Sequence, residues 1–233
     1  MALAPEARCL LHRRVKPGAR VAINGRDWVQ LSGIGPRRAA RAAQSLLSAG
    51  ATALLSWGTA GALAPQLQPG SLVLPQTVMT PGGDLFPVHA HWHAFMAGRL
   101  KGQLTSNHEP LLESPAVVAE PAEKAQLFQR WGAVAVDMES AAVAAVAAQA
   151  EVPYLVIRAV SDSAASGIPA DVINAIDANG RWRVPALTSA LLKRPQLLVD
   201  CVRLRRDFRV ACRTLRCVAA VAGPDLGARQ LTT

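Results

Sequence analysis

The sequence predicts an α/β fold built as a single domain. Short apolar runs typical of β-strands alternate with helical runs along most of the 233 residues. In the clearest stretch, β-type runs at Ala133–Val136 and Tyr154–Val160 flank an alanine-rich helical run, which is the pattern of a βαβ unit. The composition is 51% hydrophobic, which is enough to bury one large core over residues 1–233.

The remaining elements follow from local patterns. Pro36 suits the first turn of a helix, because its missing N–H costs nothing there. In chain order we expect a strand at Asp27–Ser32, a helix at Arg37–Ser48, strands at Ala51–Ser56 and Ser71–Pro75, a strand or loop edge at Leu112–Ala119, a helix at Glu120–Trp131 and a short helix at Asp171–Asn179.

A long basic amphipathic helix is predicted near the C-terminus, at about residues 195–218. Residues 193–233 contribute +6 of the formal net charge of +9. The cationic face is either the solvated side of a helix packed on its own domain or a contact with an anionic membrane surface. The apolar positions step by four and three along one helix face: Leu197, Cys201, Leu204, Phe208, Ala211, Leu215 and Val218.

The composition disfavours several classes of protein. Aromatic residues make up only 4% of the chain, so the side chains that would stack on bases are few and nucleic-acid binding is not expected. The four cysteines lack CxxC spacing, which is typical of reduced thiols in a cytosolic protein. We recognise no spanning segment and no signal peptide. We therefore expect a cytoplasmic protein, with peripheral contact at the inner membrane surface left open by the basic helix.

Three histidines, His89, His91 and His93, alternate along the chain. On a strand this spacing would place three imidazoles on one face, where they could bind a metal ion. No cysteine or carboxylate cluster lies nearby in the sequence, so we expect no metal site and interpret the segment as a polar loop over a pocket mouth.

Acidic residues end both strands of the βαβ pattern. Asp137 and Glu139 follow the first strand, and Asp162 follows the second. Because ligands of open α/β sheets bind outside the carboxyl ends of the strands, Glu139 and Asp162 are expected to share one pocket. The only carboxylate in the first eight residues is Glu6, which the sequence alone predicts to be exposed near the terminus.

Two runs of small residues could approach a ligand. The run Trp57–Ala62 follows a predicted strand, and within it Thr59 offers a hydroxyl while Gly61 allows close approach. Gly33 and Gly35 precede a helix, where free backbone N–H groups could hold an anion. An ordinary strand–helix turn is the alternative reading of the second run.

Four motifs, in order and with matching spacing over residues 2–165, carry a family resemblance: SGIGPRRAA, SWGTAGALAPQLQPGSLVLP, AVDMESAAVAAVA and VIRAVSDSA. They resemble the nucleoside phosphorylase/nucleosidase superfamily, which includes purine nucleoside phosphorylases and methylthioadenosine/S-adenosylhomocysteine (MTA/SAH) nucleosidases. AEKAQLFQRWGAVAVDMES, IPADVINAIDANG, LTSALLKRPQLL and RLRRDF resemble the hopanoid-associated phosphorylase branch. The resemblance implies a three-layer α/β/α fold with a central mixed sheet.

The resemblance assigns Asp162 as the general acid that protonates the departing purine. Such a carboxyl must be protonated near neutrality, which requires burial or a neighbouring negative charge to raise its pKa. Ser161 is expected to orient it. The segment Glu120–Lys124 stands where adenosine-type nucleosidases have an aromatic residue against the base, so the wall that stacks on the base is not identified.

The resemblance also assigns the residues around the sugar. Glu139 matches the carboxylate that binds ribose hydroxyls, and its negative charge would favour a cationic transition state. Met138 matches an apolar contact with sugar and base. Thr59, with Gly61 allowing close approach, matches a small hydroxyl residue near ribose and nucleophile.

The nucleophile is left open between water and phosphate. Related nucleosidases use an N-terminal glutamate to activate water, and Glu6 matches that residue. Related phosphorylases usually hold phosphate with an arginine there, and Arg8, with the backbone of Gly33 and Gly35, is the corresponding candidate. No cofactor is expected, with phosphate as the one co-substrate considered.

The resemblance therefore predicts an enzyme that cleaves the N-glycosidic bond of a purine nucleoside. The expected substrate is adenosylhopane, from which adenine would be released. A soluble MTA/SAH nucleosidase or a purine nucleoside phosphorylase is the alternative. Members of this superfamily usually assemble, so a homo-oligomer is expected.

Overall fold

A mixed eight-stranded sheet forms the centre of the computed structural model, which describes residues 1–11, 15–16, 18–23, 25, 27–223 and 225–231. Its strand order is β6-β5-β8-β9-β3-β10-β4-β7. The strands are β3 Leu54–Ala62, β4 Leu72–Val73, β5 Thr77–Met79, β6 Leu85–Pro87, β7 Ser106–Asn107, β8 Leu111–Glu113, β9 Ala135–Asp137 and β10 Tyr154–Asp162, and a separate antiparallel pair is formed by β1 Arg20–Ala22 and β2 Trp28–Gln30.

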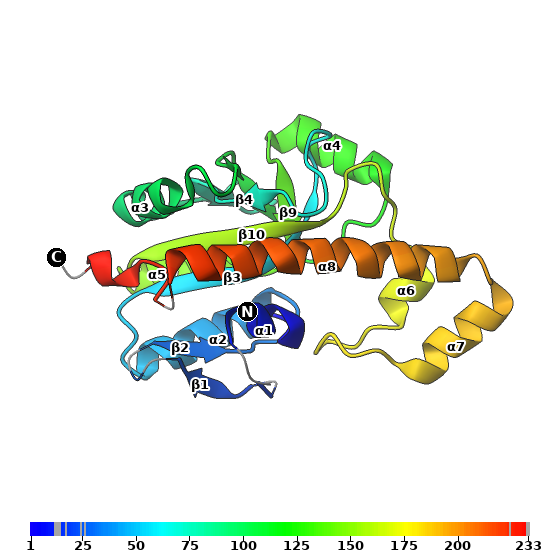
Figure 1. Ribbon diagram of the computed structural model, residues 1–233, viewed down its shortest axis with the longest axis horizontal. Helices are drawn as coiled ribbons and strands as arrows, with labels where there is room; N and C mark the ends of the chain where they lie inside the picture. Colours follow the sequence, from blue (N-terminus) through cyan, green and yellow to red (C-terminus); the bar gives the residue numbers. More distant parts are fainter. Residues whose placement is uncertain (12–14, 17, 24, 26, 224, 232–233) are drawn as a thin grey trace.

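Helices cover both faces of this sheet, which confirms the expected α/β fold with a central mixed sheet. The helices are α1 Ala4–Leu10, α2 Pro36–Ser48, α3 Ala90–Leu100, α4 Pro121–Trp131, α5 Ser140–Gln149, α6 Ala170–Asn174, α7 Val184–Lys193 and α8 Leu197–Ala222, followed by the 3-10 turn Ala228–Leu231. Figure 1 shows α8 running along β3 and β10.

The side chains of β3 show which helices lie on which face. Successive residues of a strand point to opposite faces. Ser56 makes a hydrogen bond with Ser140 of α5, whereas the indole of Trp57 donates to the backbone oxygen of Glu6 in α1. Helix α1 in turn packs against α8, and α2 packs against α5. The sheet is therefore buried between an α5/α2 layer and an α1/α8 layer.

The centre of the core is the parallel pair β3 and β10, two nine-residue strands joined at eight register positions. Val156 and Ile157 have no exposed surface, and Trp57 is 1% exposed. The apolar run predicted at residues 154–160 is thus a strand buried on both faces, as parallel strands usually are.

The predicted parallel βαβ unit is wrong in one respect. Its strand, helix and strand exist as β9, α5 and β10, but β3 lies between the two strands. β3 is antiparallel to β9 and parallel to β10, so β9 and β10 run in opposite directions. Neighbours in the chain are not neighbours in the sheet here, because the long β3 occupies the central place.

Several local predictions also need correction. The run Trp57–Ala62 lies inside β3 rather than after its end, because pairing with β10 continues through it. The strand predicted at residues 27–32 belongs to the separate β1–β2 pair. Helices α1, α3 and α7 were not predicted, and the helix expected at residues 171–179 is the shorter α6, which ends at Asn174.

The histidine segment forms the start of α3 and neither a strand nor a loop. The ring of His89 accepts a hydrogen bond from the N–H of Trp92 and so caps the helix. His93 is 7% exposed and its Nε2 lies 2.9 Å from the backbone oxygen of Leu74, so it is a core residue. Among the described residues, no three histidine, cysteine or acidic side chains gather as metal ligands.

The predicted basic helix corresponds to α8, which extends four residues beyond the expected end. Four residues of its apolar stripe, Leu197, Ala211, Leu215 and Val218, are buried against the domain. The helix is therefore an integral layer of the fold. No helix in the described part of the chain is both long and apolar enough to cross a bilayer.

Replacing Leu215 by alanine tests this packing. Leu215 has no exposed surface, so we expect the variant to lower the free energy of unfolding by about 2–5 kcal/mol in urea denaturation. Leu192→Ala is the control, because that side chain is 86% exposed and should change the value by less than about 0.5 kcal/mol. Equal effects of the two substitutions would contradict the packing of α8.

Candidate active site

The candidate site forms where β9 stops pairing with β3. β9 pairs only with Gly61 and Ala62, so it does not reach the N–H of Thr59. That N–H donates instead to Oε1 of Glu6, at 2.8 Å, and the Thr59 hydroxyl donates to the same oxygen at 2.9 Å. The backbone N–H that β9 leaves unpaired in β3 is thus the donor that binds the Glu6 carboxylate.

Glu6 is a buried acid, which corrects the expectation from the sequence alone that it is exposed. Its side chain lies in α1 with only 2% of its surface exposed. Oε2 accepts from the N–H of Leu3, at 2.9 Å, so the same carboxylate also caps the first turn of its own helix. A Cβ at position 58 would lie 2.7 Å from Oε1 of Glu6, which explains the glycine there.

A buried guanidinium joins two of the other acids. Arg158, 1% exposed, lies 2.5 Å from Oδ2 of Asp137 and 3.9 Å from Oε2 of Glu139. Its Nη2 also donates to the hydroxyls of Ser56 and Ser140, at 2.8 and 2.9 Å. No role was predicted for Arg158 from the sequence, although a lone charged residue in the apolar run YLVIRAV was the available signal.

Glu139 lies just before α5 and is 8% exposed. Its Oε1 accepts from the N–H of Gly35 at 3.0 Å. Burial, followed by the negative charge of Asp137, raises the pKa of Glu139 to about 7, although Arg158 and the Gly35 hydrogen bond act in the opposite direction. This carboxyl therefore changes charge near neutral pH.

The candidate phosphate-binding groups do not converge with these acids as expected. The Gly35 N–H is already occupied by Glu139. A Cβ at Gly33 would lie 2.9 Å from the backbone oxygen of Ala178, so this glycine permits close packing of two backbones. Arg8 is exposed, two residues beyond the buried Glu6, because such spacing places side chains on different sides of a helix.

Asp162 is buried as expected, at 6% exposure, but its neighbour is a cation. Nζ of the fully buried Lys124 donates to Oδ2 at 2.6 Å, and Ser161 donates to Oδ1 at 2.9 Å. Both oxygens of Asp162 thus act as acceptors. The expected orienting contact of Ser161 is present, whereas the negative neighbour that the sequence argument named is replaced by a positive one.

Lys124 was not recognised from the sequence as part of a site. Besides Asp162, its Nζ donates to the backbone oxygens of Ser163 and Ser166, at 2.9 and 3.0 Å. All three ammonium protons are therefore directed at acceptors. Lysines on an amphipathic helix usually face water, and only the tertiary structure distinguishes Lys124 from its exposed neighbours on α4.

The strand β3 relates Glu6 to Asp162. Thr59 contacts Glu6, and a Cβ at Gly61 would lie 3.1 Å from Oδ2 of Asp162. Positions 59 and 61 point to the same face of the strand and are about 7 Å apart along it. Two buried carboxyl groups thus contact adjacent positions on one face of β3, with Gly61 leaving room beside Asp162.

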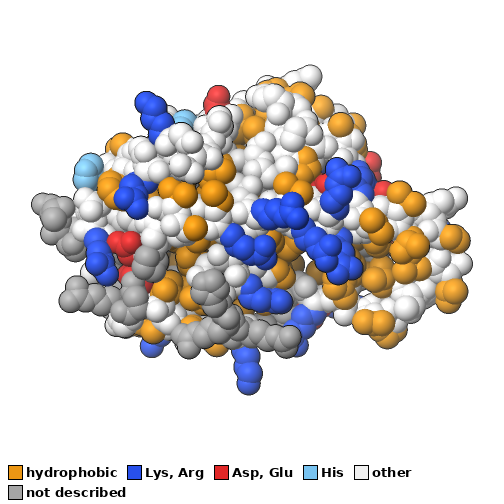
Figure 2. Space-filling view, in the orientation of Figure 1, with side chains coloured by type: hydrophobic (Ala, Val, Ile, Leu, Met, Phe, Trp, Pro, Cys, Tyr) orange, Lys and Arg blue, Asp and Glu red, His pale blue; other side chains and the backbone are white. Residues whose placement is uncertain are grey.

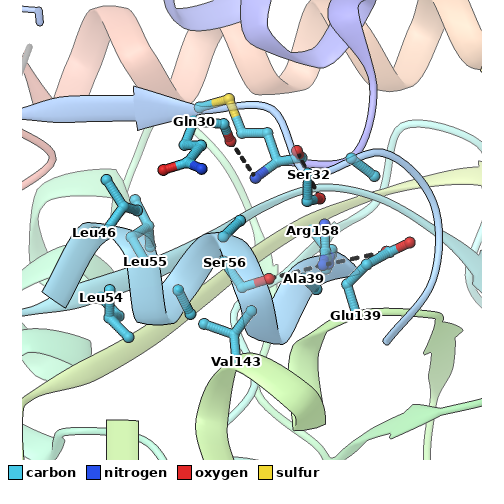
Figure 3. Close-up of a pocket in the computed structure, with 14 residues that line it drawn as sticks. Gln30, Ser32, Ala39, Leu46, Leu54, Leu55, Ser56, Glu139, Val143 and Arg158 are labelled. Atoms are coloured by element: carbon cyan, nitrogen blue, oxygen red, sulfur yellow. Dashed lines mark hydrogen bonds and ion pairs between the residues drawn. The ribbon is translucent and has the colours of Figure 1, made fainter. Parts of the chain in front are cut away.

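A small cavity is lined by Glu139 and Arg158. Its volume is about 40 Å³, and it is lined from α2, β2, β3 and α5. Figure 3 shows Glu139 and Ser56 both directed toward Arg158 at this place. The cavity is large enough for water and much too small for a nucleoside, and Asp162 does not line it. The shared nucleoside pocket of Glu139 and Asp162, with Met138 half-buried beside Glu139, stays a prediction.

Comparison with known proteins places this arrangement in a family. A model described as the Phosphorylase superfamily matches residues 17–193. The chain belongs to the phosphorylase superfamily. The superfamily match includes β3, Lys124, Glu139, Arg158 and Asp162, and it begins after Glu6.

One relative is similar to part of this chain. The chain is 30% identical over 128 residues to the 5'-methylthioadenosine/S-adenosylhomocysteine nucleosidase of Buchnera aphidicola subsp. Baizongia pistaciae, an alignment that covers 47% of this chain. The chain thereby spans about half, 51%, of the length of that relative.

Solved structures share the fold at low identity. The futalosine hydrolase of Helicobacter pylori superposes with a TM-score of 0.65 at 17% identity, covering 94% of each chain. The 5'-methylthioadenosine/S-adenosylhomocysteine nucleosidase of the same organism, with butyl-thio-DADMe-Immucillin-A, gives a TM-score of 0.67 at 17% identity, covering 94% of this chain and 95% of the other.

The raised pKa of Glu139 predicts a dependence of stability on pH. Between about pH 4.5, the ordinary value, and about 7, the folded chain keeps a proton that the unfolded chain releases. The contribution of Glu139 to the free energy of unfolding therefore falls as pH rises through this window. Urea denaturation across this range should show a flatter pH dependence for Glu139→Gln than for the unchanged protein. Identical slopes would contradict the raised pKa.

Proposed function

We propose that this protein is a nucleosidase that releases adenine from a nucleoside by attack of water on the N-glycosidic bond. The observation that carries the proposal is the pair of buried carboxyl groups, Glu6 and Asp162, on adjacent same-face positions of β3. Glycosidic hydrolysis needs two such groups, one acting on the nucleophile and one on the leaving group.

Water is favoured over phosphate by the charge around Glu6. A carboxylate can take a proton from water, whereas it repels an incoming phosphate. The candidate phosphate ligand Arg8 is exposed, and Arg158 is already bound to Asp137 and Glu139. In this proposal Glu6 accepts the proton of the attacking water, and Thr59 holds the carboxylate in place through two hydrogen bonds.

Glu139 would act on the sugar. In its ionised form it binds ribose hydroxyls and stabilises the positive charge that develops on the sugar as the bond breaks. Because its pKa is raised to about 7, this form is populated from neutral pH upward. Met138 would contribute an apolar contact to the sugar and base.

The proton for the base would come from the Lys124–Asp162 pair. Asp162 accepts hydrogen bonds on both oxygens, and Nζ of Lys124 is the nearest charged donor, at 2.6 Å. As the purine departs, the Asp162 carboxylate takes a proton from the Lys124 ammonium and passes that proton to the imidazole-ring nitrogen of the base. The neutral amine that remains is reprotonated from solvent after release.

The proposed substrate is adenosylhopane, an adenine nucleoside bonded through its sugar to a triterpenoid lipid. The motifs around residues 122–140 and 168–208 resemble the hopanoid-associated branch, and this resemblance is the support for the lipid-linked substrate. Soluble MTA or S-adenosylhomocysteine is the alternative, favoured by the relative that is 30% identical over 128 residues. With water as the nucleophile, the products would be adenine and ribosylhopane. With phosphate, they would be adenine and ribosylhopane phosphate.

Adenine release from adenosylhopane, with and without inorganic phosphate, tests the reaction. We expect equal release in both conditions. Glu6→Gln and Asp162→Asn should each lower the rate about 10²–10⁴-fold, because each removes a proton-transferring group. Asp84→Asn is the matched control, since this acid is exposed on a turn and should leave the rate unchanged.

The outcomes separate the alternatives. Strict dependence on phosphate would make the protein a phosphorylase. Faster release from methylthioadenosine than from adenosylhopane would assign a soluble substrate. Full activity of both the Glu6 and the Asp162 variants would overturn the assignment of these carboxyl groups.

The proton path predicts a specific effect of Lys124→Met. Without the ammonium, Asp162 must carry its own proton, so we expect kcat/KM to fall at neutral pH and its optimum to move toward acid. Lys124→Arg should not restore the neutral activity, since a guanidinium keeps a hydrogen-bond donor beside Asp162 but does not release a proton. Lys101→Met is the control at an exposed position. Thermal denaturation shows whether each variant is folded, and an unchanged pH profile in folded Lys124→Met would exclude the path.

A further inference from the structure

Helix α7 has no buried residue along its length, and it leads into α8 through an exposed turn. Large apolar side chains are rarely this exposed together in a soluble monomer. The exposed fractions in this region are 49% for Trp182, 62% for Val184, 86% for Leu192, 59% for Leu198, 72% for Val199 and 60% for Val202.

Next to this apolar patch, the outer face of α8 carries a row of cations. From Leu198 and Val202 the exposed positions proceed in steps of three or four, which keeps them on one side of the helix. Figure 2 shows Lys and Arg side chains gathered over the middle of α8 and hydrophobic side chains gathered over α7 at one end of the molecule. The exposed arginines of this row are Arg205, Arg206, Arg209, Arg213 and Arg216.

Carboxylates neutralise only part of this surface. Arg203 pairs with Asp200 at 2.8 Å, Arg194 with Asp171 at 3.4 Å, and Nε of Arg206 lies 3.6 Å from Asp207. Within the described residues, the other four arginines of the row have no carboxylate within 4.0 Å. The surface therefore has an excess of positive charge directly beside an exposed apolar patch.

We propose that the α7–α8 surface, defined as the exposed apolar side chains of residues 182–202 and the exposed arginines of residues 205–216, docks on a membrane that contains anionic lipid. Apolar side chains would enter the boundary between headgroups and acyl chains, and the arginines would contact lipid phosphates. The packed stripe of α8 stays in the core, so docking requires no unfolding of the helix.

Charge complementarity favours a bilayer over a second copy of this chain. A twofold interface brings the same patch of two subunits together, and here it would oppose two rows of arginines. A bilayer with anionic lipid offers an apolar layer for the exposed apolar side chains and negative headgroup charge for the arginines. The inference deepens the proposed function by naming the partner of an enzyme whose proposed substrate is a lipid, yet its test uses no catalysis.

Vesicle sedimentation of the full-length protein tests the inference. Vesicles of phosphatidylcholine alone are compared with vesicles of phosphatidylcholine mixed with phosphatidylglycerol. We expect retention on the mixed vesicles only, weakened by salt. Leu192→Glu combined with Val199→Glu should weaken partitioning more than about tenfold, because it places charge in the apolar patch. The control is Leu85→Glu with Val117→Glu, two other exposed apolar positions.

A second set of variants tests the cationic row. Arg205→Gln, Arg209→Gln and Arg213→Gln together should weaken partitioning about a hundredfold, since each cation near an anionic surface contributes about fivefold. Arg41→Gln, Lys101→Gln and Arg130→Gln make the same change in net charge at exposed positions elsewhere and should have a small effect.

Three outcomes would overturn the inference. The unchanged protein could fail to sediment with the mixed vesicles, or the matched controls could lose as much binding as the test variants. Alternatively, light scattering could reveal an oligomer that dissociates in the Leu192→Glu and Val199→Glu variant, which would assign the patch to a second copy. If vesicle binding follows the expected pattern but no adenine is released from any nucleoside, the docking surface stands and the proposed reaction fails.

Discussion

The arrangement of the site depends on the buried guanidinium of Arg158. A charge with 1% exposure is tolerated only where carboxylates and hydrogen-bond acceptors compensate for lost hydration. Asp137 supplies the close ion pair, and Ser56 and Ser140 supply hydroxyl oxygens. Because these partners come from the end of β9, from within β3 and from the start of α5, the same guanidinium links three elements, and Glu139 lies 3.9 Å from it.

A second buried cation, Lys124, lies near the C-terminal end of β3, beyond the central position Gly58 that Arg158 faces. Lys124 links α4 to the end of β10 through Asp162 and to the following turn through two backbone oxygens. Because Gly58 and Gly61 have no side chains, the carboxylates of Glu6 and Asp162 can approach the backbone of β3 closely. The site is thus a row of acids, each held by a cation or by backbone N–H groups.

Local patterns predicted the burial of Asp162 but not the order of the strands around it. The motif around Asp162 identified a buried carboxyl with Ser161 beside it, because a continuous apolar run signals a buried strand. The expected βαβ unit was wrong in that β9 and β10 run in opposite directions with β3 between them, which nothing in the run AVDMES indicates. Glu6 was recognised through family resemblance, whereas the terminal sequence alone suggested an exposed acid. Its carboxylate accepts from the N–H of Thr59, which is free to donate because β9 ends before it could pair there.

The sequence by itself determined that this chain folds as an α/β protein of the phosphorylase superfamily, with an amphipathic C-terminal helix, because periodicity and motifs are local properties of the chain. The tertiary structure alone decided which charges are buried and with whom. Lys124 resembles the exposed basic residues of the sequence, and Leu192 resembles a core leucine. Their opposite fates follow from long-range packing: burial depends on which elements meet, and that is settled only when the sheet and its covering helices assemble.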